Sequence, residues 1–196
     1  MYTCTVSSPS RATGVQFTAR PQVVAFAGSR RGLLPESIAF SVVHAFHASG
    51  LSFLTGCATG IDSCFRQALA MRPYEQHTMI ACAFESRARR LDSGGLAAFS
   101  VVPDGLSPAA ALHRRTVWMV GHCGLLVLFP TDPVSGRWGR GSSLAFRAAL
   151  DHAKPVFVDS PTVPPPSPLY RVFPASLFGI VSGFWVIPEG SHCDEE

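Results

Sequence analysis

Three short segments of the sequence combine the residue types that hold phosphate groups. Glycines let a backbone approach a ligand closely, and free N–H groups at the start of a helix attract anions. Serine and threonine hydroxyls add hydrogen-bond donors, and arginine adds a positive charge with a planar, bidentate fork. The segments are residues 28–32 (GSRRG), 55–62 (TGCATGID) and 139–143 (GRGSS). The residues expected to bind the ligand are Gly28, Ser29, Arg30, Gly56, Ala58, Thr59, Gly60, Asp62, Gly139, Gly141, Ser142 and Ser143.

A fourth segment, residues 112–119 (LHRRTVWM), adds a further arginine. On a helix Arg115 shares a face with Leu112 and Met119, whereas Arg114 points elsewhere. We therefore expect Arg115 to clamp a phosphate and Arg114 to lie in solvent. Gly60→Val should abolish ligand binding by keeping the ligand from the backbone, and Arg114→Ala should barely change it.

Alternating strands and helices must position these segments. Short apolar runs predict strands over 22–27, 51–54, 78–83, 97–102, 124–129 and 155–158. Helices are predicted over 36–49, 61–71, 108–123 and 142–152, with a short helix or loop over 87–92. This alternation is typical of an α/β fold, a Rossmann-like three-layer sandwich with a mostly parallel sheet. Each glycine-rich segment follows a strand, so all three should meet at the carboxyl edge, where such folds bind ligands.

Composition changes divide the chain into four segments. Residues 1–20 predict a flexible N-terminal arm, and residues 21–159 the Rossmann-like domain. Residues 160–168 are a proline-rich connector, and residues 169–196 a C-terminal extension. In the extension, apolar stretches on both sides of Ser182 and Gly183 predict a hairpin with its turn at that pair. Such a hairpin is not stable alone in water, so it should pack on the domain or on a partner subunit. We therefore expect a homodimer or a higher homo-oligomer.

Composition also excludes several classes of protein. The chain has 196 residues, of which 47% are hydrophobic and 15% charged, so it can bury a core and is not disordered overall. No apolar run is long enough to span a membrane, and the polar N-terminus has no signal-peptide pattern, which predicts a cytoplasmic protein. The formal net charge of +3 is too small to indicate nucleic-acid binding by itself.

Cofactor and metal motifs are absent from the sequence. The six cysteines contain no CxxC pair, and without an export signal they predict reduced thiols rather than disulfides or a metal site. No Walker A loop or GxGxxG fingerprint occurs, so neither a P-loop ATPase nor an ordinary NAD enzyme is indicated, and no cofactor is expected.

The order of the motifs resembles that of the SLOG superfamily, which includes DprA (Smf) proteins, the YspA/YpsA-related proteins and the Lonely guy enzymes. The motifs are GSR at 28–30, TGxAxGID at 55–62, HRR at 113–115 and GxGSS at 139–143. The resemblance spans roughly residues 22–158. It implies a Rossmann-like fold whose glycine-rich loops bind nucleotides or related ligands.

Departures from the family patterns separate its branches. Lonely guy phosphoribohydrolases carry a glutamate pair after PGGxGT, where this chain has Leu144 and Ala145. Cleavage of a glycosidic bond requires a carboxylate near the sugar, so no catalytic residue is assigned. Residues 55–62 and 141–144 match DprA proteins, which bind single-stranded DNA, better. The favoured interpretation is a sensor or binding module for a nucleotide or phosphorylated ligand. A DprA-like single-stranded DNA-binding protein of DNA processing and a nucleotide phosphoribohydrolase are the alternatives.

Overall fold

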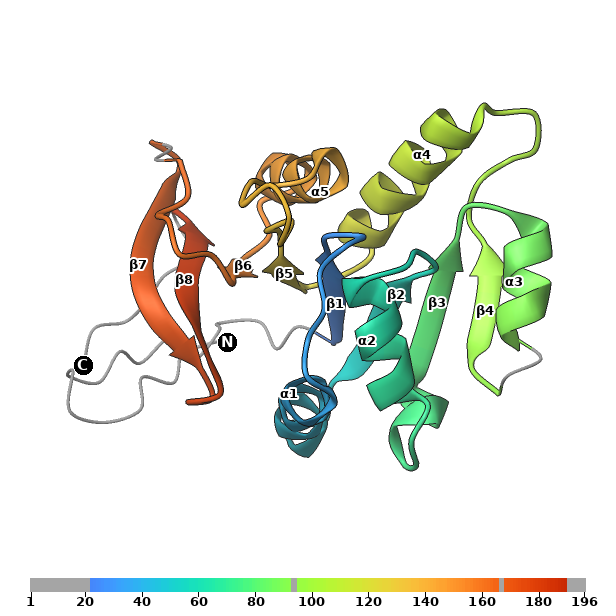
Figure 1. The fold of residues 1–196 in the computed structure, drawn as a ribbon, viewed down its shortest axis with the longest axis horizontal. Helices are drawn as coiled ribbons and strands as arrows, with labels where there is room; N and C mark the ends of the chain where they lie inside the picture. The colour runs from blue at the N-terminus through green and yellow to red at the C-terminus, as the bar shows by residue number, and fades with distance from the viewer. Residues whose placement is uncertain (1–21, 93–94, 166–167, 190–196) are drawn as a thin grey trace.

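The computed structural model describes residues 22–92, 95–165 and 168–189, and their strands form a single twisted sheet (Figure 1). The predicted N-terminal arm over 1–20 lies outside these residues. The order of the strands across the sheet is β4-β3-β2-β1-β5-β6-β8-β7. The strands are β1 (Val23–Gly28), β2 (Ser52–Gly56), β3 (Thr78–Cys82), β4 (Ala97–Ser100), β5 (Leu125–Phe129), β6 (Val156–Val158), β7 (Tyr170–Leu177) and β8 (Val181–Pro188).

The first six strands are parallel, and an α-helix connects each of them to the next along the chain. The helices are α1 (Glu36–Ala48), α2 (Ile61–Leu69), α3 (Glu85–Asp92), α4 (Pro108–Gly121) and α5 (Arg140–Asp151), with a 3-10 turn, η1 (Tyr74–His77), before β3. The expected α/β, Rossmann-like sandwich with a mostly parallel sheet is confirmed. Helix α5 begins at Arg140, two residues earlier than predicted, so Arg140 lies in its first turn. No helix of the described residues is long and apolar enough to cross a membrane.

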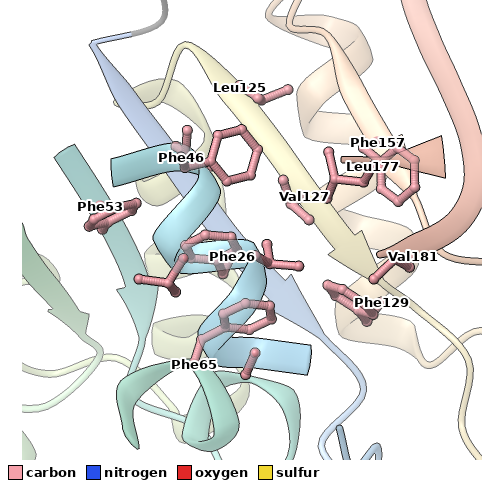
Figure 2. Packing of buried hydrophobic residues seen from close by; sticks show 14 of the residues in the cluster. Phe26, Phe46, Phe53, Phe65, Leu125, Val127, Phe129, Phe157, Leu177 and Val181 are labelled. Carbon is pink, nitrogen blue, oxygen red and sulfur yellow. The ribbon is translucent and has the colours of Figure 1, made fainter. Parts of the chain in front are cut away.

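Alternation along β1 separates the two faces of the core. Val24 and Phe26 pack with α1 and α2, whereas Ala25 and Ala27 pack with α4 and α5 on the opposite face. Figure 2 shows the first face, in which the rings of Phe26 and Phe65 stack with centroids 4.1 Å apart. β1 is buried on both faces, which explains why the sequence of this parallel strand is almost continuously apolar.

The C-terminal hairpin extends the sheet through an antiparallel contact. β8 pairs with β6, where Phe157 lies opposite Trp185, and β7 pairs with β8 as the edge strand. The predicted turn at Ser182 and Gly183 is wrong, because the chain turns at residues 178–180, where Phe178 and Gly179 have positive φ values of 55° and 72°. Gly183 lies inside β8, where a Cβ would overlap the carbonyl oxygen of Val158 on β6. That glycine allows two strands to approach rather than a chain reversal.

Candidate nucleotide-binding cleft

The three glycine-rich segments meet at the carboxyl edge of the sheet, around a cleft of about 1100 Å³. We call it the carboxyl-edge cleft. Segment 28–32 follows β1, segment 57–60 joins β2 to α2, and segment 139–143 opens α5. Helix α4 supplies a further wall through Leu112, Arg115 and Met119, the face predicted from the sequence. The predicted residues that line the cleft are Gly28, Ser29, Arg30, Ala58, Asp62, Arg115, Gly139, Gly141, Ser142 and Ser143.

The first loop is fixed by its own serine. The buried Ser29 hydroxyl accepts hydrogen bonds from the backbone N–H groups of Arg31 and Gly32, both at 3.2 Å. Ser29 therefore shapes the turn, and the loop presents the exposed side chains of Arg30 and Arg31 to the cleft. Arg31 lies 3.9 Å from the Asp132 carboxylate and remains 69% exposed, so this contact leaves its guanidinium accessible.

Three predicted ligand-binding residues do not line the cleft. A Cβ on Gly60, whose φ is +70°, would overlap the backbone of Ser29 and Arg30. The Thr59 hydroxyl donates to the Arg30 carbonyl at 3.2 Å, and the Ile61 N–H donates to the Ser29 carbonyl at 3.1 Å. Gly60 is thus required for packing between the first and second loops, which differs from the expected close approach of a ligand.

Gly56, the third of these residues, lies beside a buried ion pair. Arg115 Nη1 is 3.3 Å from Asp62 Oδ2, and each side chain is only 5% exposed. The Ala58 N–H also donates to Asp62 Oδ2, at 3.2 Å. A Cβ on Gly56 would overlap both Arg115 and Asp62, so the glycine makes room for the pair. Arg115 Nε has no hydrogen-bond partner among the described residues although it is buried.

The start of α5 supplies backbone N–H groups that have no intrahelical acceptor. Its first residue follows Gly139, no side chain caps the helix, and the first intrahelical bond runs from Ser143 N–H to the Gly139 carbonyl. The earlier N–H groups of the helix therefore have no intrahelical acceptor, as at any helix start. The Ser142 hydroxyl is buried and, within the described chain, also lacks a partner. Helix starts of this kind favour anions.

Two solved structures share this fold. No family model and no curated protein matches the sequence. DNA processing protein A (DprA) from Helicobacter pylori aligns over 70% of this chain and 65% of its own, with a TM-score of 0.54 and 18% identity. DprA from Streptococcus pneumoniae aligns over 74% of this chain and 51% of its own, with a TM-score of 0.50 and 22% identity.

Over the aligned region, this chain shares the fold of the two DprA proteins. It spans less than two thirds of either DprA chain, and the likeness to DprA proteins expected from the glycine-rich motifs is confirmed at the level of the fold. The Helicobacter protein binds single-stranded DNA in a mode unique to it.

The DprA fold brings together more charge than the motifs alone indicate. Arg140 of the third glycine-rich segment and Arg147 are exposed and line the cleft from α5, and only Arg147 lies outside the segments identified from the sequence. They lie seven residues apart on one helix, a spacing that places both on the same face and that could have identified Arg147. Arg114 is exposed and lies outside the cleft, as its place on the helix predicted.

Carboxylates in the cleft are few and already engaged. Asp62 pairs with Arg115, and Asp132 accepts hydrogen bonds from the N–H groups of Val134 and Ser135. These bonds, chiefly that from Ser135, lower the pKa of Asp132. Leu144 and Ala145 line the cleft where Lonely guy enzymes carry carboxylates. The arrangement favours binding of a phosphate ester over hydrolysis of a glycosidic bond.

Proposed function

We propose that the carboxyl-edge cleft binds single-stranded DNA. The observation that carries the proposal is the set of arginines from three elements around one cleft, which comprises Arg30, Arg31, Arg115, Arg140 and Arg147. Against them stand two aspartates, so the lining has an excess of three positive charges. The cleft therefore carries a local excess of positive charge that suits an anionic partner.

The form of the cleft supports a strand as the ligand. Four of the five arginines are exposed, on the loop after β1 and on α5, so they can contact successive backbone phosphates. Arginine suits this role because its planar fork binds phosphate through two hydrogen bonds. The single-stranded DNA binding mode of the Helicobacter protein, which has the same fold, supports the same partner.

A free nucleotide or another phosphorylated small molecule is the second candidate. Two buried polar atoms of residues that line the cleft favour it, since the Ser142 hydroxyl and Arg115 Nε have no hydrogen-bond partner among the described residues. Buried donors of this kind bind a compact phosphate group well, because an unmade hydrogen bond is costly away from water.

The cytoplasmic location and the homodimer or higher oligomer remain predictions.

Titration of a fluorescent oligonucleotide over a range of salt concentrations tests the proposal. Four phosphate contacts by the exposed arginines give a logarithmic salt slope near −3, since each contact contributes about −0.7 on a single strand. The Arg30→Ala/Arg31→Ala variant should make the slope shallower by about 1.4. Arg114→Ala is the matched control, because this arginine is exposed outside the cleft, and it should leave the slope unchanged.

Two results would decide against single-stranded DNA. One is absence of binding at low salt; the other is an equal effect of the Arg30/Arg31 and Arg114 variants. Calorimetry with nucleoside monophosphates then tests the second candidate. Mononucleotide binding that Ser142→Ala weakens, without any binding of the oligonucleotide, would identify the cleft as a small-molecule site.

A further inference from the structure

Two cysteines lie at the ends of adjacent parallel strands. In the register of β2 and β3, Gly56 lies opposite Ala81. The residues that follow them are Cys57 and Cys82. Both thiols are buried, with 4% and 0% exposure, and they belong to one apolar cluster with Ile80, Ala88 and Leu96. Register and packing therefore place the two cysteines side by side.

Their separation suits a disulfide. Neighbouring strands lie about 4.8 Å apart, and the Cα atoms of a disulfide are usually about 4.4–6.8 Å apart. The Cys82 thiol and the Ala83 backbone N–H are the neighbouring donors that favour the charged form of Cys57. Both cysteines are free in this structure, so the bond can form between neighbours that the strand register already places side by side.

The pair has one nucleophilic and one protonated member. The hydrogen bond from Cys82 lowers the pKa of Cys57 to about 6, and the Arg115 guanidinium and the Ala83 N–H act in the same direction. Burial and the Asp62 carboxylate oppose this shift of the Cys57 pKa. The same hydrogen bond, together with burial, raises the pKa of Cys82. A thiolate is the nucleophile in cysteine chemistry, so Cys57 is the reactive member.

We propose that Cys57 and Cys82 form a reversible disulfide when the protein meets a hydroperoxide. The Cys57 thiolate attacks one peroxide oxygen, the O–O bond breaks, and hydroxide or alkoxide leaves, which gives a sulfenic acid. The Cys82 sulfur then attacks the Cys57 sulfur, and the sulfenic oxygen leaves as water with the Cys82 proton. Two thiols are oxidised to a disulfide, and the peroxide is reduced to water and, for an alkyl hydroperoxide, an alcohol.

The disulfide would act directly on the second glycine-rich loop. Cys57 precedes Ala58, whose N–H donates to Asp62, and the Cys57 carbonyl accepts hydrogen bonds from the Arg87 guanidinium. Oxidation joins the first residue of this loop to the end of β3, beside the Asp62–Arg115 pair. The inference does not depend on the identity of the ligand, because thiol oxidation can be measured with the cleft empty.

Peptide mapping of the full chain after exposure to hydrogen peroxide tests the proposal. Free thiols are blocked with iodoacetamide, and trypsin then releases residues 32–66 with Cys57 and residues 67–87 with Cys82, because Arg72 precedes proline. The expected product is these two peptides joined and lighter by two hydrogen atoms, which dithiothreitol separates. The joined peptides should be absent from Cys57→Ser and Cys82→Ser and present in Cys64→Ser, whose cysteine lies on the same peptide as Cys57.

Two outcomes would overturn the proposal. In one, Cys57 accumulates as sulfinic acid while iodoacetamide still alkylates Cys82, which shows that the Cys82 thiol stayed free. In the other, a disulfide joins Cys57 to a different cysteine. A measurement on the unsubstituted chain guards against variants that fail to fold. In that chain, fragmentation of the joined peptides distinguishes a bond at Cys57 from one at Cys64, and Cys82 is the single cysteine of residues 67–87.

Discussion

Asp62 and Arg115 lie 53 residues apart in the chain and form a buried ion pair, with 3.3 Å between Oδ2 and Nη1. The pair joins the first turn of α2 to the middle of α4, and both residues line the carboxyl-edge cleft. It holds two helices from opposite faces of the sheet at the place where β2 ends. The floor of the cleft is therefore also a structural element of the domain.

Asp62→Asn should destabilise the protein by about 3 kcal/mol, because removal of one partner leaves a buried, uncompensated charge on Arg115. Urea unfolding at neutral pH measures the loss. Glu85→Gln is the control, since it removes the exposed Arg89–Glu85 pair at 3.1 Å and should cost less than about 1 kcal/mol. Similar losses in the two variants would mean that the buried pair contributes no more than a surface pair.

Gly60→Ala should be more destabilising than Gly136→Ala, although both glycines have a similar φ, +70° and +66°. Each substitution places a side chain at positive φ, which costs roughly 1–3 kcal/mol. At Gly60 the added Cβ also overlaps the backbone of Ser29 and Arg30, whereas at Gly136 it meets nothing within 4 Å. Gly60→Ala should therefore cost about 1–3 kcal/mol more than Gly136→Ala because of overpacking. The difference between the two denaturation midpoints measures this extra cost. Equal midpoints would show that the loops relax around the methyl group.

The sequence was sufficient to predict the elements around the cleft. Buried parallel strands such as β1 and β5 are apolar on both faces, so they appear as continuous runs that end at a loop. Each glycine-rich segment follows such a run, and parallel strands end at one edge. That topology alone was enough to predict that Arg30, Asp62 and Ser142 line one cleft.

Partners within the cleft could not be predicted in this way. Asp62 has the position of an ordinary helix-start carboxylate, and only the approach of α4 to α2 makes it the partner of Arg115. Gly60 and Gly183 have no local signal for what their missing side chains would meet, because those neighbours are distant in sequence. The wrong hairpin turn has the same origin, since Gly183 was assigned to a turn that Gly179 makes.

Trp185→Ala should cost about 3–5 kcal/mol, the usual range for loss of a large buried aromatic side chain. Trp185 is 4% exposed and packs edge-on against Phe157 of β6, with ring centroids 5.3 Å apart. The C-terminal hairpin thus shares its core with the sheet and should unfold together with it. Val163→Ala, at a side chain 66% exposed, should stay within about 0.5 kcal/mol of the unsubstituted protein. Loss of the hairpin alone, in a separate early transition, would contradict a common core.

Asp159 and Asp132 should give stability effects of opposite sign as pH changes. Burial raises the pKa of Asp159 above its usual 3.8, so its charged form is penalised in the folded state. Stability that comes from this raised pKa is present below 3.8 and is lost as pH rises through the folded value. Asp159→Asn should therefore stabilise the protein at pH 7, and the gain should disappear in acid.

Hydrogen bonds from Ser135 and Val134 lower the pKa of Asp132, whose contribution to stability is present above pH 3.8 and is lost as pH falls through the lowered value. Asp132→Asn should destabilise at pH 7, and urea unfolding of both variants at neutral and acidic pH checks the pair. Effects of the same sign at pH 7 would show that burial does not dominate at Asp159.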